Sequence, residues 1–358
     1  MRTAPSPLPP LTTKDMPTQE QIGEEAHRLY GLLARVTRPN IPAWTLTDCQ
    51  VAAAYTLEIN RLKKEKNAII LAHSYTTPDI IYGVADFSGD SYQLAQHARI
   101  SNAQIIVFAG VWFMAQTAKI LNPAKQVLIP ARQAGCTLAD SMKAEDVRSL
   151  RKQHPGIPML CYINSSAEVK ALCDVCVTSG NVFDIAQKMP GNKLIFVPDI
   201  LMAQNIAIEL KRRGTPKEVI SSGGTCCVHA QFTPEHVQLL RAQHPGIIVL
   251  AHPECSPDVC ALCDYVGSTK GMADYVAHSP AQTFGLLTEL GLVNRLQVEH
   301  PQKKFVWSSG VCSYMKKNTL LNIWQALAKP QEEQIVTLDE TVAAAAKKSI
   351  DKMFELTQ

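Results

Sequence analysis

The sequence has no strong excess of charge of either sign, since 35 lysine and arginine residues stand against 32 aspartate and glutamate residues. The formal net charge of +3 is too small to indicate binding to nucleic acid, and no long basic run is present. No apolar run reaches the roughly 18 residues that a membrane-spanning helix needs. The N-terminus, residues 1–15, is rich in proline and lacks an apolar signal core, which predicts a cytoplasmic protein. Neither nucleic acid nor a membrane is therefore an expected partner.

Cysteine is abundant, with 11 copies in 358 residues. An odd number without a signal sequence favours metal ligands or buried small residues over a disulfide framework. Cys136, Cys226 and Cys312 each follow a strand-like run and a turn of small residues, at intervals of 90 and 86 residues. This spacing predicts three similar units that each deliver one thiolate to a common point.

Short apolar runs begin each of these units, at residues 68–72, 159–161 and 247–251. Such runs are typical of buried parallel strands, and their alternation with helical segments predicts three small parallel α/β units. The expected divisions are an N-terminal extension (1–49), three α/β repeats (50–136, 137–226 and 227–320) and a C-terminal helical segment (321–358). We expect residues 1–18 to be disordered, helices over 20–36 and 47–66, and a last helix over 338–356 packed on the outside.

Polar side chains gather at the predicted strand ends, where ligands bind in folds of this class. Histidines, tyrosines and a glutamate at equivalent ends predict an acid–base pocket, although a lone histidine is more often structural. The turns that end in Ser91, Ser179 and Thr269 each precede a predicted helix, which indicates either an anion site or plain N-capping. The other candidates are His73, Tyr75, Tyr162, Asn164, His229, His252 and Glu254.

The three repeated cysteines suit a cubane iron–sulfur cluster held at three irons, or a three-ligand zinc site with one open position. Buried packing is the alternative, because that is the usual role of a free cysteine. Cys226 is favoured over the adjacent Cys227 by its place in the repeat. The CxxC pairs Cys173/Cys176 and Cys260/Cys263 also have zinc or redox interpretations, but we favour packing for both.

Over residues 60–320 the sequence resembles the quinolinate synthase family, the A protein of bacterial NAD biosynthesis. The resemblance is carried by many short motifs together, among them 72–75 (AHSY), 89–91 (GDS), 113–121 (FMAQTAKIL), 134–136 (AGC), 162–164 (YIN), 167–171 (AEVKA), 178–179 (TS), 226–229 (CCVH), 252–255 (HPEC), 266–269 (VGST) and 312–320. It implies three α/β/α domains in a pseudo-threefold arrangement around a central iron–sulfur site.

The same resemblance implies condensation of iminoaspartate with dihydroxyacetone phosphate to quinolinate, phosphate and water, and a functional link to an L-aspartate oxidase or dehydrogenase. It implies a [4Fe–4S] cluster, a Lewis acid with one open iron, bound by Cys136, Cys226 and Cys312. We expect Glu254 to be the principal acid/base and Tyr75 to guide condensation, with His73 and His252 also catalytic. The implied substrate-binding residues are His73, Ser91, Tyr162, Asn164, Ser179, His229, His252, Glu254 and Thr269.

The sequence departs from the family at Gln116, where glutamate is usual, and at 200–202, where a basic residue and Leu-Gly are common. Residues 1–49 contain no motif that we can place. An open-iron hydratase of hydroxy acids is the main alternative, and it would not need a triose phosphate. A non-catalytic cluster or zinc sensor is a third hypothesis, but a sensor has no need of a polar substrate pocket.

Overall fold

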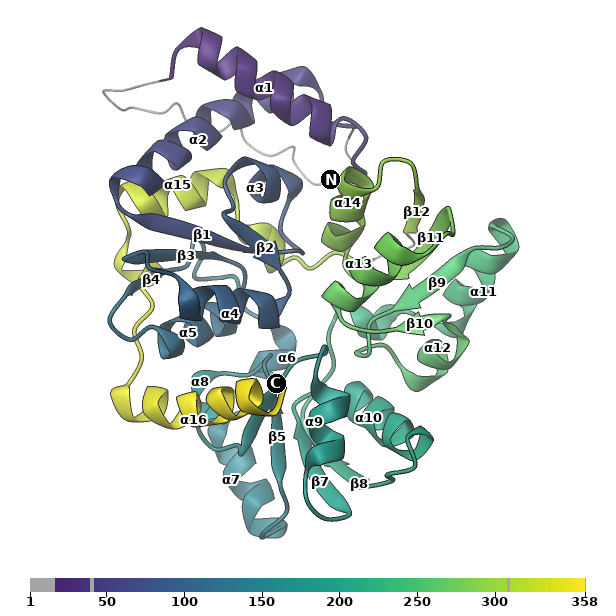
Figure 1. Cartoon of the computed structure of the whole chain (residues 1–358). Coiled ribbons are helices and arrows are strands. Elements are labelled where there is room, and N and C mark those ends of the chain that lie inside the picture. Colours follow the sequence, from purple (N-terminus) through teal and green to yellow (C-terminus); the bar gives the residue numbers. More distant parts are fainter. Residues whose placement is uncertain (1–16, 39–41, 308–309, 358) are drawn as a thin grey trace.

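The computed structural model describes residues 17–38, 42–307 and 310–357. Within them, each of the three predicted apolar runs forms a strand inside a four-stranded, all-parallel sheet. The strand orders are β2-β1-β3-β4, β6-β5-β7-β8 and β10-β9-β11-β12, so one topology occurs three times. The predicted α/β architecture of three similar parallel units is therefore confirmed, and Figure 1 shows the units arranged around a common centre.

Helices alternate with strands throughout the three units. The strands are β1 (Ala68–His73), β2 (Phe87–Gly89), β3 (Ile105–Ala109), β4 (Gln126–Leu128), β5 (Met159–Tyr162), β6 (Val175–Val177), β7 (Lys193–Val197), β8 (Glu218–Ser221), β9 (Ile248–Ala251), β10 (Tyr265–Val266), β11 (Thr283–Leu287) and β12 (Lys304–Trp307). The helices are α3 (Pro78–Gly83), α4 (Ser91–Ile100), α5 (Trp112–Leu121), α6 (Thr137–Asp140), α7 (Ala144–Gln153), α8 (Ala167–Lys170), α9 (Val182–Lys188), α10 (Ile200–Arg212), α11 (Pro234–Gln243), α12 (Pro257–Leu262), α13 (Thr269–His278) and α14 (Leu290–Glu299).

A repeated aspartate fixes the register of the first strand pair in every sheet. Asp86, Asp174 and Asp264 each accept a hydrogen bond at 2.7 Å from a backbone N–H of the neighbouring strand. A nearby cation neutralises each carboxylate, namely Lys63, Arg151 or Arg241. The three segments that contain these aspartates were predicted as turns, but each includes a strand of only two or three residues, too short to give an apolar run.

Two further helices precede the first sheet and two follow the third. Helices α1 (Gln19–Leu33) and α2 (Leu46–Glu65) confirm the predicted front helices, and they form one apolar cluster with β1, β3 and α15 (Leu320–Ala328). The predicted disorder of 1–18 falls, apart from Pro17 and Thr18, outside the described residues. The proposed domain boundaries stay a prediction. None of the helices in the described ranges is both long and apolar enough to cross a membrane.

The last helix, α16 (Glu340–Thr357), packs on the outside, as the sequence predicted, and keeps its polar face exposed. It runs along β6 and α8 and also contacts α5, so it bridges the first and second units (Figure 1). Ala346, Ile350, Met353 and Phe354 are buried in the large apolar cluster that spans both units. The period of the helix identified its apolar face but did not indicate that this face would join two units.

Candidate active site

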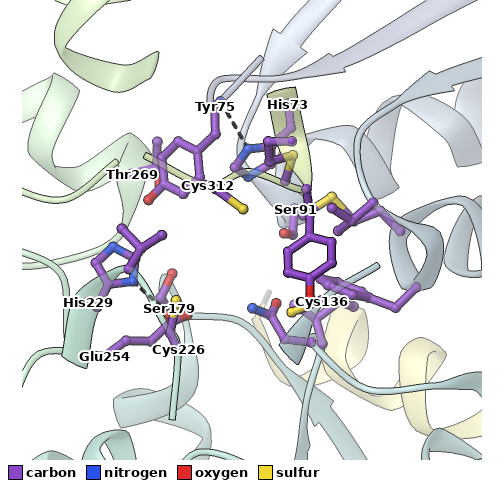
Figure 2. Close-up of a pocket in the computed structure, with 18 of the residues that line it drawn as sticks. His73, Tyr75, Ser91, Cys136, Ser179, Cys226, His229, Glu254, Thr269 and Cys312 are labelled. Carbon is purple, nitrogen blue, oxygen red and sulfur yellow. Dashed lines mark hydrogen bonds and ion pairs between the residues drawn. The ribbon is translucent and has the colours of Figure 1, made fainter. Parts of the chain in front are cut away.

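One cavity lies where the three units meet, and every predicted site residue lines it. Figure 2 labels most of these residues. The strand ends of all three sheets contribute, as expected for ligand sites in parallel α/β folds. These residues are His73, Tyr75, Ser91, Cys136, Tyr162, Asn164, Ser179, Cys226, His229, His252, Glu254, Thr269 and Cys312. The structure therefore brings together side chains that are far apart in the sequence, while their individual roles stay predictions.

The three repeated cysteines occupy the same local turn. The carbonyl oxygens of Cys136, Cys226 and Cys312 each accept a hydrogen bond from the backbone N–H four residues later, at 2.9, 2.9 and 3.1 Å. Each sulfur also faces the backbone N–H groups two and three residues later, which favour a thiolate. Cys227 is exposed, so this geometry supports Cys226 as the member of the set.

Each cysteine turn is also attached to its own sheet in the same way. A backbone N–H at the start of the helix that follows the third strand donates to the carbonyl two residues before the cysteine. The three pairs are Trp112 to Ala134 at 2.7 Å, Ile200 to Gly224 at 3.1 Å and Leu290 to Gly310 at 2.9 Å. The fold thus presents three sulfurs from three equivalent positions.

Burial keeps these thiols protonated in the absence of a cation. It raises the pKa of Cys136 to about 12 and that of Cys312 to about 11, and it raises the pKa of Cys226 well above its ordinary value. A coordinated metal ion reverses this preference, because a thiol that binds it loses its proton. The donor set therefore fits a site for a metal or a metal cluster.

A second group of possible ligands overlaps with the first. The donor atoms of Cys226, His229 and Glu254 lie within 4.8 Å of one another, and they form the one such group found among the described residues. Cysteine, histidine and glutamate are all zinc ligands. The CxxC pairs lie in different units, Cys173/Cys176 around β6 and Cys260/Cys263 at the end of α12, and their interpretation as packing residues stays a prediction.

Glu254 is the centre of a buried hydrogen-bond network. Tyr162 donates its hydroxyl to one carboxylate oxygen at 2.5 Å, and Nδ1 of His229 lies 2.8 Å from the other. Burial opposes ionisation of Glu254, but the imidazoles of His252 and His229 and the two hydrogen bonds outweigh burial and lower its pKa. Burial and the Glu254 charge raise the pKa of Tyr162 well above its ordinary value. The pair therefore consists of a carboxylate and a protonated phenol.

His73 and His252 are buried, neutral imidazoles. Burial lowers the pKa of each to about 3. The next cause that lowers it is the charge of Lys316 for His73 and the imidazole of His229 for His252. Nδ1 of His73 accepts the backbone N–H of Tyr75 at 3.1 Å, and Nδ1 of His252 accepts that of Glu254 at 3.3 Å. We assign the remaining proton of each ring to Nε2, so that both rings can donate one hydrogen bond.

Thr288 is a buried contact that the sequence reasoning missed. Its hydroxyl lies 2.9 Å from the hydroxyl of Tyr75 and 3.0 Å from Nε2 of His229. Tyr75 also receives a hydrogen bond from Thr269 at 3.0 Å, and burial keeps the pKa of Tyr75 well above its ordinary value. Thr288 directly follows β11, a strand that the sequence analysis did not identify, and the run Thr283–Leu287 was the signal that could have revealed it.

The hydroxyls of the three Ser/Thr turns do not cap helices. Asp90 caps α4 instead of Ser91, and Ser268 caps α13 instead of Thr269, because these preceding residues accept the free N–H groups. In the described part of the chain, the Ser91 and Ser179 side chains have no hydrogen-bond partner, and both face the cavity. Plain N-capping is therefore wrong for these hydroxyls.

The departures from the family pattern have structural explanations. Gln116 is buried, and its side-chain oxygen accepts the backbone N–H of Ala167 at 3.3 Å. The 200–202 segment forms the first turn of α10, which Asp199 caps at 2.9 Å through the N–H groups of Leu201 and Met202. Neither departure removes a side chain that lines the cavity.

Comparisons with a family model and with individual relatives point to the same family. Residues 57–355 match the family described as "Quinolinate synthetase A protein". The chain is 47% identical over 292 residues to "Quinolinate synthase 2" of Mesorhizobium japonicum, covering 82% of this chain and 88% of the relative. It is 46% identical over 298 residues to "Quinolinate synthase" of Xylella fastidiosa, covering 83% and 86%, respectively. It is 42% identical over 347 residues to "Quinolinate synthase" of Agrobacterium fabrum, covering 96% of both chains.

Proposed function

The chain belongs to the quinolinate synthetase A protein family, and on that premise we propose that it condenses iminoaspartate with dihydroxyacetone phosphate. The products are quinolinate, phosphate and water, and an L-aspartate oxidase or dehydrogenase would supply the imine. The observation that supports this proposal most directly is the cavity at the junction of three units, in which three thiols face an acid–base network.

Cys136, Cys226 and Cys312 are the residues that would hold a [4Fe–4S] cluster at three of its irons. When bound, such a cluster supplies an iron with an open position, a Lewis acid for an oxygen of the substrate. Three matching turns with N–H groups directed at each sulfur support this assignment.

The protein groups around the cavity suit anionic substrates and proton transfer. The hydroxyls of Ser91 and Ser179 and the Nε2–H groups of His73 and His252 are hydrogen-bond donors for carboxylate and phosphate oxygens. Glu254 is ionised and would accept a proton from carbon during ring closure, while its partner Tyr162 is protonated and can donate one. Tyr75, held by Thr269 and Thr288, would orient the two substrates for condensation.

A zinc ion held by Cys226, His229 and Glu254 is the second candidate, because their donor atoms lie within 4.8 Å of one another. Iron, sulfide and zinc content after purification without oxygen separates the two sites. We expect about four irons and four sulfides per chain, as for one cubane cluster. The cluster should be lost in Cys136→Ala, Cys226→Ala and Cys312→Ala and kept in the matched control Cys227→Ala. Stoichiometric zinc, or no metal, would refute the cluster.

Glu254→Gln tests the acid–base assignment. This variant should keep its iron and lose turnover, because an amide cannot accept the proton. Normal turnover would remove Glu254 from that role, and loss of metal would instead favour the zinc site. Omitting dihydroxyacetone phosphate separates the synthase from a hydratase, since a hydratase would still act on a hydroxy acid alone.

A further inference from the structure

An ion pair between the buried Glu289 and the partly exposed Lys316 lies directly behind the Cys312 turn. Glu289 caps α14 and has no exposed surface; one carboxylate oxygen accepts the N–H of Gly291 at 2.6 Å. The other oxygen accepts the N–H of Cys312 at 3.0 Å and lies 2.9 Å from Nζ of Lys316. Glu289 therefore holds the backbone of a cysteine that we assign to the cluster.

The same ion pair reaches the first unit. Nζ of Lys316 also donates to the backbone carbonyl of Tyr75 at 2.6 Å. Helix α14 approaches this loop so closely that a Cβ on Gly291 would lie 2.6 Å from the Ser74 carbonyl oxygen and from the Tyr75 Cα. Nη1 of Arg295 donates to the Ser74 hydroxyl at 3.1 Å. The third unit is thus joined to the loop that carries Tyr75 by several independent contacts.

The other two units do not repeat this connection. Glu289 is the N-cap residue of the helix after the third strand, and its counterparts are Val111 and Asp199. Val111 has no carboxylate, and Asp199 directs one oxygen to the N–H groups of its own helix without a hydrogen bond to Cys226. Among the described residues, only the third unit places a carboxylate on the N–H of its cysteine.

We propose that Glu289 and Lys316 are positioning residues that hold Cys312 and Tyr75 in a fixed relation to each other. This inference rests on the proposed function, because it takes Cys312 as a cluster ligand and Tyr75 as the residue that orients the substrates. Glu289 accepts the N–H of Cys312, and Lys316 donates to the carbonyl of Tyr75. Loss of either member of the ion pair would therefore make both the Cys312 turn and the Tyr75 loop less rigid.

Release of iron to a chelator without oxygen tests the first half of the proposal. Glu289→Gln keeps the shape of the side chain but removes the ion pair, and we expect iron to leave about 10–100-fold faster, the usual effect of losing an outer partner of a metal ligand. The matched control is Glu58→Gln, because Glu58 is equally buried and paired with Arg61 but contacts no cysteine turn. Wild-type release rates in Glu289→Gln, or equal acceleration in the control, would overturn the proposal.

Alkylation of Cys312 in cluster-free protein tests the same contact without relying on the cluster. Mass spectrometry after a maleimide pulse should show faster labelling of Cys312 in Glu289→Gln and in Lys316→Met, with Cys227 as the exposed internal reference. An unchanged Cys312 rate contradicts the inference even where iron binding is normal. A wild-type chain without iron and sulfide refutes the proposed function instead, and labelling still reports on the turn.

Steady-state kinetics test the connection to Tyr75. Lys316→Met should lower kcat, while KM for the triose phosphate changes little, because Lys316 contacts the backbone of Tyr75 and does not line the cavity. Lys316→Arg should restore most of the rate, since its guanidinium can still donate to both oxygens. Equal loss in the Arg and Met variants, with unchanged Cys312 labelling, would show that the pair does not position the site.

Discussion

Thr288→Val is the most direct test of the hydrogen-bond network. The substitution keeps the size and branching of the side chain but removes the hydroxyl between Tyr75 and His229. Tyr75 would retain its bond from Thr269, whereas Nε2 of His229 would lose its one hydrogen-bond partner in the described residues. The change therefore leaves a buried imidazole nitrogen unsatisfied.

The expected loss of folding stability follows from that unpaired nitrogen. A buried polar group without its partner destabilises the folded state by about 1–3 kcal/mol. Because Thr288 and His229 are almost fully buried, water cannot replace the lost partner. We expect the free energy of unfolding to fall by about 2 kcal/mol. If the transition state loses the same stabilisation of about 2 kcal/mol, kcat/KM would fall by about 30-fold.

Urea unfolding of Thr288→Val beside Thr288→Ser measures the effect. Serine keeps the hydroxyl and loses one methyl group, so it should cost about 1 kcal/mol and retain most of the activity. The valine variant should be the less stable of the two and by far the less active. If valine were as stable and active as wild type, or no worse than serine, the hydroxyl would not hold Tyr75 and His229.

Two further predictions concern buried titratable groups. The pKa of His73 is about 3 in the folded chain and about 6.5 when unfolded, so the unfolded chain binds more protons in this range and stability is lost as the pH falls from about 6.5 towards 3. His73→Asn should make the fall in the free energy of unfolding, measured with urea, shallower by up to about 1.4 kcal/mol per pH unit, and an unchanged slope would contradict the assignment. Lys170 is fully buried, bonded to the Ser165 carbonyl and 5.3 Å from the Phe113 ring, and burial lowers its pKa. The free energy of unfolding of Lys170→Met should lie within about 1.5 kcal/mol of the wild-type value, whereas that of Lys170→Ala should be lower by about 2–5 kcal/mol. Equal losses in the two variants would show that the cavity left by alanine is not the cause.

The sequence was sufficient to predict the repeated architecture because each repeat contains the same local sequence patterns. Apolar runs such as Ile69–Leu71 identify the strands that open each unit, and the carboxyl ends of parallel strands must meet at one edge. The cysteine interval then indicates that three equivalent turns converge. Recognition of the family added the roles of residues such as Asn164, for which the pattern alone gave only a place at a strand end.

Other features were not predicted, either because a local signal was missed or because they depend on contacts between distant segments. Thr288 and Glu289 follow β11, whose run Thr283–Leu287 was not identified as a strand. Lys316 has two acceptors that belong to different units, Tyr75 and Glu289, and no local pattern pairs them. The bridging position of α16 has the same origin, since its apolar face would suit any exposed surface.

The repeat explains why the site can be symmetric in one respect and asymmetric in another. The cysteine turns are equivalent down to the backbone bond four residues later, which suits a ligand held alike from three sides. The strand ends at equivalent positions differ, and they carry His73 and Tyr75, Tyr162 and Asn164, and His252 and Glu254. The two unlike substrates of the proposed reaction would require such differences, because one side would supply a base and another would orient the partner. We infer that the fold provides the repeated ligand positions, and that the differences between repeats provide the chemistry and, with Glu289 in place of Val111, its positioning.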